Sequence, residues 1–443
     1  MRVLVTPSRR LEGTIQVPGD KSISHRAALV GALATGPTEL SGFLEGEDCL
    51  RTLGALQALG VEVTRKGPGQ YRVGGTGLAG LQEPESVLDC GNSGTSARLL
   101  LGVLAGQAFS SVLTGDDSLR RRPMQRISGP LMRMGATVVG RQEGSRLPLA
   151  IRGRRPLRRG IHRLPVASAQ VKSALLLAGL AADGPVTVEE PAPSRDHTEV
   201  ILARFGAKIE REQQSVTITP GGELRGRPVQ IPGDFSSAAF FLVAGCVVAD
   251  SRVTIPDVGV NPTRTGLLDA LAEMGANIEC KETPDSGTGD SHEGEPIALL
   301  TATSSRLKGG GVSGALIPRL IDELPILAVA AALAGGVTEV RDARELRVKE
   351  SDRISALVTE LGKLGARIEE REDGFLIRGG RPLTGARVDS HGDHRMAMAL
   401  IVAGLVAQGF TLVEDIDSIA VSYPAFLDTL QSLGGEACVR VQS

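Results

Sequence analysis

The chain has 443 residues, of which 41% are hydrophobic, and its formal net charge at pH 7 is −2. This balanced charge does not favour nucleic-acid or membrane binding, and an aromatic content of 2% disfavours base-stacking surfaces. Because a single hydrophobic core rarely serves more than about 250–300 residues, the length predicts two domains.

Cysteine usage and the N-terminus predict the compartment. The five cysteines are scattered and show no CxxC spacing, which is typical of a reduced cytosolic chain. The start of the chain lacks the apolar segment of a signal peptide, and the longest apolar runs fall short of the roughly 20 residues that cross a bilayer. We therefore expect a cytoplasmic protein. His391 and His394 have no ligand-like neighbours, so no metal site is predicted.

A turn rich in Gly, Ser and Asp, followed by an apolar helix, recurs along the chain. Small polar residues at a helix start accept hydrogen bonds from the first N–H groups, so Asp20, Asp234 and Asp393 are expected to be helix caps. A helix that is apolar all round must be buried. Since helix N-termini attract anions, we expect the buried helices to gather around an anion. The six turns span 18–26, 89–96, 168–172, 233–237, 322–325 and 392–396.

A second signature, a hydrophobe-Gly-small step, ends an amphipathic helix in each unit. Glycine just past a helix end is typical of the left-handed cap. The glycines are 69 to 75 residues apart, with one interval of 90 that contains a predicted surface insertion at 281–290, extending to about 296. The six glycines are Gly60, Gly135, Gly206, Gly275, Gly365 and Gly434.

The elements of each unit follow the order β-α-β-α-β-β. Short strands at 14–17 and 229–231 are expected to lead into the first and fourth buried helices. The sixth unit lacks its last strand, and the unpaired segment Arg2–Val5 can fill that place. We therefore expect an α/β fold of two domains with three βαβαββ repeats each. The N-terminal domain would span 20–230 and the C-terminal domain 1–19 plus 231–443, with the active site in the cleft between them.

The loops before these helices carry the charged residues. Arginine grips phosphate and carboxylate groups in bidentate fashion, so this set predicts a polyanion site with an acid/base pair. Asp322 is equally well read as a helix cap, and His25 as a structural histidine. The GxGxxG match at 75–80 is not followed by a predicted helix, which disfavours a nucleotide loop. The candidate residues are Lys21, Arg26, Arg122, Arg195, Asp322, Lys349, Glu350, Arg353 and Arg395.

Six motifs along the chain are distinctive. They are Pro18-Gly-Asp-Lys-Ser-Ile-Ser-His-Arg26, Gly91-Asn-Ser-Gly-Thr-Ser-Ala-Arg98, Arg122-Pro-Met124, Ser168-Ala-Gln-Val-Lys-Ser173, Arg347-Val-Lys-Glu-Ser-Asp-Arg353 and Gly392-Asp-His-Arg-Met-Ala-Met398. In this order they resemble the 3-phosphoshikimate 1-carboxyvinyltransferase (EPSP synthase) family of enolpyruvyl transferases. The resemblance implies an inside-out α/β barrel in each domain, as well as closure of the domains on the substrates.

The resemblance also implies the reaction. The enolpyruvyl group of phosphoenolpyruvate would pass to the 5-hydroxyl of shikimate 3-phosphate through a tetrahedral intermediate, with release of phosphate. No cofactor or metal is implied, and the protein would be a monomer of the shikimate pathway, the target of glyphosate, without nucleic-acid partners. Asp322 would be the base at the 5-hydroxyl, Glu350 the acid for the methylene, and Lys21 and Lys349 further catalytic groups.

Binding residues follow from the same resemblance. Phosphoenolpyruvate would contact Lys21, Asn92, Gly94, Arg122, Gln170, Arg353 and Arg395. Shikimate 3-phosphate would contact Lys21, Ser22, Arg26, Ser168, Ala169, Gln170, Arg195, Asp322 and Lys349.

Two departures and three alternatives remain. Ser168-Ala169 stand where one branch of the family has a serine pair before the glutamine. Val421 stands before Ser422-Tyr423-Pro424, where one branch of the family has a lysine. The related UDP-N-acetylglucosamine carboxyvinyltransferases would place a cysteine within 115–122, and this chain has none there. An RNA-phosphate cyclase of the same fold would need an ATP site and a nucleophilic histidine. A non-catalytic anion-binding protein would gain nothing from Asp322 and Glu350.

Overall fold

The computed structural model describes residues 1–283, 294–435 and 438–442. The chain forms two compact units. Unit 1 comprises Met1–Pro18, Pro232–Ser286 and Pro296–Ser443, and unit 2 comprises Gly19–Ile231 and Gly287–Glu295. Three four-stranded sheets belong to each unit.

Unit 2 contains the sheets β14-β3-β5-β4, β6-β7-β9-β8 and β10-β11-β13-β12. Its strands are β3 (Thr35–Ser41), β4 (Val63–Gly67), β5 (Gln70–Thr76), β6 (Leu88–Asp89), β7 (Ser110–Thr114), β8 (Thr137–Gly140), β9 (Arg146–Arg152), β10 (Gly160–Arg163), β11 (Val186–Glu189), β12 (Lys208–Arg211), β13 (Ser215–Thr219) and β14 (Val229–Gln230). Its helices are α1 (Lys21–Leu33), α2 (Glu47–Ala58), α3 (Gly94–Ala105), α4 (Asp117–Arg121), α5 (Gln125–Arg133), α6 (Arg141–Gly144), α7 (Ala169–Gly179) and α8 (His197–Arg204).

Unit 1 contains the sheets β16-β17-β15-β2, β18-β19-β21-β20 and β22-β23-β1-β24. Its strands are β1 (Arg2–Val5), β2 (Glu12–Thr14), β15 (Arg252–Gly259), β16 (Asn277–Glu282), β17 (Ile297–Thr303), β18 (Gly311–Val312), β19 (Val337–Val340), β20 (Arg367–Arg371), β21 (Gly374–Arg378), β22 (Arg387–Asp389), β23 (Thr411–Glu414) and β24 (Val439–Gln442). Its helices are α9 (Phe235–Val247), α10 (Gly266–Glu273), α11 (Ile317–Leu320), α12 (Leu324–Leu333), α13 (Arg353–Lys363), α14 (His394–Gly404) and α15 (Phe426–Leu430), with short helices η1 (Gly314–Leu316), η2 (Arg344–Val348), η3 (Ile416–Val421) and η4 (Gln431–Gly435).

All six sheets share one topology. In four of them the first strand of a repeat pairs in parallel with the second, as Leu88 does with Leu113 between β6 and β7; in the other two, β2 pairs in parallel with β15 and β14 with β3. The remaining two strands add in antiparallel fashion, as β9 and β8 do beside β7. A parallel pair needs a crossover connection, and in those four sheets the buried helix of the repeat supplies it. The predicted α/β class and the βαβαββ order are confirmed.

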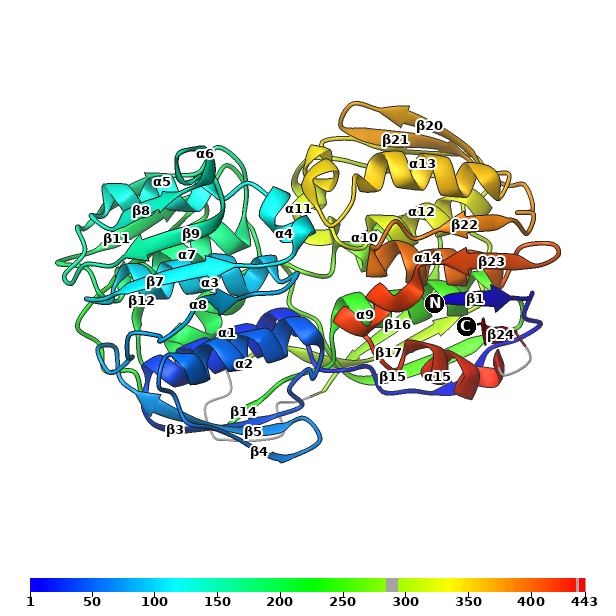
Figure 1. Cartoon of the computed structure of the whole chain (residues 1–443). Helices are drawn as coiled ribbons and strands as arrows, with labels where there is room; N and C mark the ends of the chain where they lie inside the picture. Colours follow the sequence, from blue (N-terminus) through cyan, green and yellow to red (C-terminus); the bar gives the residue numbers. More distant parts are fainter. Residues whose placement is uncertain (284–293, 436–437, 443) are drawn as a thin grey trace. The chain divides into compact units, whose positions relative to one another are not determined.

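Apolar helices form the centre of each unit, as their composition predicts. Eleven consecutive residues of α1, Ile23–Leu33, are buried, and α9 and α12 are buried over nearly their whole length. In unit 2, α3 packs against α7 and α1, and in unit 1, α12 packs against α14 and α9 (Figure 1). The amphipathic helices α2, α5, α10 and α13 bury one face only.

The glycine signature is confirmed at every repeat. The six glycines that follow the amphipathic helices have φ between 82° and 106°. This is the left-handed region, which a side chain disfavours and which closes the helix C-terminus.

The N-terminal strand takes the place predicted for it. β1 lies between β23 and β24, with Val3 opposite both Val413 and Val441. The two ends of the chain therefore meet in one sheet (Figure 1). Val3 and Val5 are completely buried, so this short strand contributes to the core of unit 1.

Two predicted elements differ from the structure. The strand before α1 spans Glu12–Thr14 rather than 14–17, and it pairs with β15 of unit 1. The strand before α9 pairs with β3 of unit 2. Each of these two strands therefore completes a sheet of the unit opposite to the one its helix enters. The predicted insertion begins later than expected, because β16 extends to Glu282 and pairs Lys281 with Leu299; residues 284–293 lie outside the described part.

Candidate functional site

The start of α3 collects two arginines in unit 2. Ser93 caps this helix by accepting a hydrogen bond from the Ser96 N–H. Arg122 donates to Asn92 Oδ1 over 2.6 Å. A Cβ at Gly94 would stand 2.7 Å from Nη1 of Arg98 and 3.2 Å from Nη1 of Arg122. A side chain at position 94 would therefore push these guanidinium groups away from the helix N-terminus, where backbone N–H groups also favour an anion.

Gln170 joins this group from α7. Its Oε1 accepts from Arg98 over 2.7 Å, and its Nε2 donates to Thr95 Oγ1 over 2.9 Å. The predicted residues Asn92, Gly94, Arg122 and Gln170 thus lie together. The role of Arg98 was missed by the sequence reasoning, although its spacing of four residues from Gly94 places both on one helix face.

Lys21, at the start of α1, is held next to the same helix. Its ammonium lies 2.6 Å from Oδ2 of Asp48, which belongs to the first turn of α2. The Asp48 carbonyl accepts from the Ser96 hydroxyl, and Ser96 lies 2.7 Å from Thr52 Oγ1. The Thr52 hydroxyl also lies 2.8 Å from His25 Nδ1. Burial, with Lys21 and Arg26 nearby, lowers the pKa of His25 well below its usual value. The buried, hydrogen-bonded ring is consistent with a structural histidine.

Arg26 is buried among hydroxyl and carbonyl oxygens. It donates to Thr198 Oγ1 over 2.6 Å, to Ser173 Oγ over 2.9 Å and to the Ser22 carbonyl over 3.0 Å. Burial lowers the pKa of Arg26 to about 10; Glu199 opposes this shift and Arg195 adds to it. A guanidinium with this pKa stays charged at neutral pH. Because it is buried, binding of an additional anion beside it would be favourable.

Ser168 and Ala169 form the entry to α7. Ser168 occupies the N-cap position and its backbone N–H donates to Glu190 Oε1 over 2.9 Å. Ala169 is the first helical residue, so its N–H belongs to the N-terminal turn that lacks partners within the helix.

Asp322 is the centre of the charged group in unit 1. It lies between α11 and α12, with its Oδ1 3.2 Å from Nζ of Lys349 and 3.4 Å from Nη1 of Arg353. The N-cap position of α12 is taken by Glu323. The helix-cap interpretation of Asp322 is therefore wrong, whereas Asp20, Asp234 and Asp393 all accept N–H bonds as caps.

Arg353 is buried between carboxylates. It lies 2.7 Å from both Asp393 Oδ2 and Glu350 Oε2, in addition to its contact with Asp322. Burial alone would lower the pKa of Arg353, but Asp393 and Glu350 outweigh it and raise that pKa. Burial likewise opposes the charged form of Asp393, yet Arg353 holds its pKa below the usual range. Both groups therefore stay ionised.

Arg395 approaches the same carboxylates from α14. Its Nη1 donates to the Asp322 carbonyl over 3.1 Å and lies 3.6 Å from Oε1 of Glu323. Glu323 in turn lies 3.3 Å from Nη1 of Arg264, which also contacts Asp234. The link from Glu323 to Arg264 was missed, because the two residues are 59 positions apart in the chain.

The predicted site residues thus form one set in each unit. Lys21, Ser22, Arg26, Asn92, Gly94, Arg122, Ser168, Ala169, Gln170 and Arg195 belong to unit 2, and Asp322, Lys349, Glu350, Arg353 and Arg395 belong to unit 1. In both sets some members lie at the N-terminal ends of buried helices, such as Lys21, Gly94, Ala169 and Arg395, whereas others, such as Arg26 and Arg122, do not. Among the described residues, no group of three or more His, Cys, Asp or Glu side chains is arranged to hold a metal ion.

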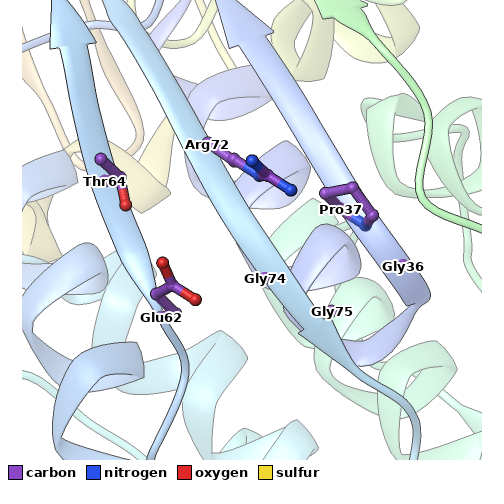
Figure 2. Close-up of a pocket in the computed structure, with 7 residues that line it drawn as sticks. All are labelled: Gly36, Pro37, Glu62, Thr64, Arg72, Gly74 and Gly75. Atoms are coloured by element: carbon purple, nitrogen blue, oxygen red, sulfur yellow. The ribbon is translucent and has the colours of Figure 1, made fainter.

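Other surface features lie away from these sets. A hollow of about 170 Å³ on the β3–β5–β4 sheet is lined by Glu62, Thr64, Arg72, Pro37 and glycines, and contains none of the predicted residues (Figure 2). The GxGxxG segment begins at the end of β5, and residues 77–87 continue as turns and coil rather than as a helix. Within the described residues, each helix is too short or too polar to cross a bilayer.

Comparison with known proteins defines the class. The EPSP synthase (3-phosphoshikimate 1-carboxyvinyltransferase) family model matches residues 5–430. A 3-phosphoshikimate 1-carboxyvinyltransferase of Desulforudis audaxviator is 55% identical over 98% of this chain and 99% of its own. A protein of the same name from Geobacter sulfurreducens is 53% identical over 96% of this chain and 98% of its own. The solved EPSP synthase of Acinetobacter baumannii matches with a TM-score of 0.88 and 41% identity, covering 100% of both chains.

The βαβαββ repeats together with the family match define a carboxyvinyl transferase of the α/β class. More particularly, the chain belongs to the EPSP synthase family, whose place is in the shikimate pathway of aromatic biosynthesis. The expected family, fold class and enzyme activity are confirmed.

Proposed function

We propose that this chain transfers the enolpyruvyl group of phosphoenolpyruvate to the 5-hydroxyl of shikimate 3-phosphate, and that the two residue sets act on the same pair of substrates. Two observations support the proposal: an acid/base group around Asp322 in unit 1, and a cationic helix start around Gly94 in unit 2. Both substrates are anions, so they need such cations to offset charge repulsion between them.

The residues around α3 are proposed to hold phosphoenolpyruvate. Arg122 and Lys21 would bind its phosphate and carboxylate, with Gln170 and Asn92 supplying neutral hydrogen bonds. Gly94 has no side chain, so the ligand could come close to the backbone there. Arg98 and Arg122 lie within 3.2 Å of the place of a Cβ and would be beside it. Arg395 and Arg353 would complete the set from unit 1. Arg353 can do so only if its contact with Glu350 opens, because its guanidinium is already shared among carboxylates.

Shikimate 3-phosphate is proposed to bind at the start of α7 and beside Arg26. The Ala169 N–H and the Ser168 hydroxyl lie at a helix N-terminus, which suits a phosphate. Ser22, Gln170 and Arg195 would contact the same ligand.

Acid and base roles fall to unit 1. Asp322 would accept the proton of the attacking 5-hydroxyl, and Lys349, whose Nζ lies 3.2 Å from Asp322 Oδ1, would lie next to that hydroxyl. Glu350 would protonate the methylene carbon, so it must first take up a proton and leave Arg353. The units would close on the substrates and exclude water from the reacting groups. We further propose that the enzyme works as a monomer in the cytoplasm.

Phosphate release tests the proposal. The enzyme is given phosphoenolpyruvate with either shikimate 3-phosphate or UDP-N-acetylglucosamine as acceptor. We expect release only with shikimate 3-phosphate. Release only with the nucleotide sugar, or binding of both anions without turnover, would contradict the proposal.

A further inference from the structure

A buried charge cluster in unit 2 lies behind the proposed shikimate 3-phosphate residues. It consists of Lys172 on α7, Glu190 after β11 and Glu199 on α8. The exposed fractions of their side chains are 3%, 5% and 1%. Such groups are rarely kept in a protein interior unless each is paired.

Lys172, on α7, contacts two further segments: the loop after β11, through Glu190 and Ser194, and α8, through Glu199. Its Nζ lies 2.9 Å from Glu190 Oε2 and 2.9 Å from Glu199 Oε1, and it donates to the Ser194 carbonyl over 3.2 Å. Burial alone would lower the pKa of Lys172, but Glu199 and Glu190 outweigh it and raise that pKa. Burial also raises the pKa of Glu199, despite the nearby lysine.

Each segment tied by Lys172 continues into a proposed ligand contact. Glu190 accepts the Ser168 N–H over 2.9 Å and the Ser194 hydroxyl over 2.7 Å. Ser194 directly precedes Arg195. Glu199 lies one residue after Thr198, whose hydroxyl receives Arg26 over 2.6 Å. The Lys172 ammonium is therefore linked, through Glu190, to the backbone of Ser168 and to the loop that contains Arg195. Through Glu199 it is linked to α8, whose Thr198 accepts a hydrogen bond from Arg26.

We propose that Lys172 is a positioning residue that sets the geometry of the shikimate 3-phosphate half of the site without touching the ligand. The reason is geometric: the ammonium of Lys172, on α7, contacts the loop that follows β11 and α8 at once, beside the Ser173–Thr198 hydroxyl contact that also links α7 to α8. This inference rests on the proposed function.

Three variants test it, with Lys208→Met as a matched control because Lys208 is an exposed lysine of β12 in the same unit. Lys172→Met removes the ammonium and leaves two buried carboxylates, so its melting midpoint should fall. Lys172→Met/Glu199→Gln removes one of those carboxylates and should recover most of that loss. Glu190→Gln keeps an acceptor for the Ser168 N–H and serves if Lys172→Met does not fold.

The measurements are kcat, the KM of each substrate and direct calorimetric binding of shikimate 3-phosphate. We expect every folded variant except the control to raise KM and Kd for shikimate 3-phosphate about tenfold. The KM for phosphoenolpyruvate should change less than threefold. Values for shikimate 3-phosphate within twofold of the parent in the folded double variant would overturn the inference and leave a purely structural role. A parent enzyme that fails to bind shikimate 3-phosphate would instead overturn the proposed function, and this inference with it.

Discussion

Replacing Asp322 by Asn separates its catalytic role from its structural one. The substitution keeps the shape of the side chain but removes the charge that lies 3.2 Å from Lys349 and 3.4 Å from Arg353. Arg353 retains Asp393 and Glu350, each at 2.7 Å, and Lys349 is partly exposed to water. We therefore expect the stability of the fold to fall by only about 1 kcal/mol.

The catalytic effect should be much larger. Loss of a general base costs roughly 10²–10⁴ in rate, which corresponds to about 2.7–5.5 kcal/mol of activation free energy. The Asp322 carbonyl, which holds Arg395, is unchanged by the substitution. Turnover should therefore collapse while binding of shikimate 3-phosphate stays within a few-fold of the parent.

The assay is phosphate release under saturating substrates, with calorimetric binding and a thermal melt of the same sample. Asp269→Asn is the matched control, since it removes a half-exposed carboxylate that pairs with Arg319 in the same unit. A kcat of Asp322→Asn within threefold of the parent would refute the role of Asp322 as base. A parallel loss of binding and melting midpoint would show that the residue acts through structure.

Two further predictions follow from the geometry. Gly94→Ala places a methyl group 2.7 Å from Arg98 Nη1, so KM for phosphoenolpyruvate should rise about tenfold and glyphosate should inhibit less. Steady-state kinetics and inhibition assays measure both effects. An unchanged inhibition constant would contradict this prediction. Asp393→Asn should melt at a lower temperature at pH 7, because it leaves the buried Arg353 with one fewer partner. Since Arg353 lowers the pKa of Asp393, its stabilising effect is present above about pH 4 and is lost as the pH falls. The parent melting temperature should therefore drop more between pH 7 and pH 3 than that of the variant, and equal drops would count against the pair.

Repetition made much of the fold predictable. Glycines such as Gly60 and Gly206 end helices because those positions need a positive φ. This requirement is local, so the spacing of the glycines in one sequence is enough to identify the repeats. The strands at 14–17 and 229–231 fall in the C-terminal and N-terminal domains by the predicted boundaries, but local sequence does not fix which strands of those domains they pair with. The long-range pairing with β15 and β3 decides between them.

The candidate site was predictable where one short motif contains both the start of a helix and the side chains proposed to bind or react. Lys21, Gly94 and Gln170 sit in such motifs, and the resemblance to EPSP synthases suggested their roles. Arg98 and Glu323 lay in or beside the same motifs, yet their contacts depend on the packing of α3 against α7 and of α14 against the start of α12. Helix packing of this kind has no signature in sequence spacing.

The sequence by itself determined the six repeats, the buried helices and the kinds of charge at their starts, because caps, glycines and hydrophobic periodicity act over a few residues. Only the tertiary structure decided which charges pair. It assigned Asp322 to Lys349 and Arg353 instead of to a helix cap, and it joined Lys172 to Glu190 and Glu199 in one buried cluster. Coulomb interactions and desolvation depend on distances and burial that exist only after the chain has folded.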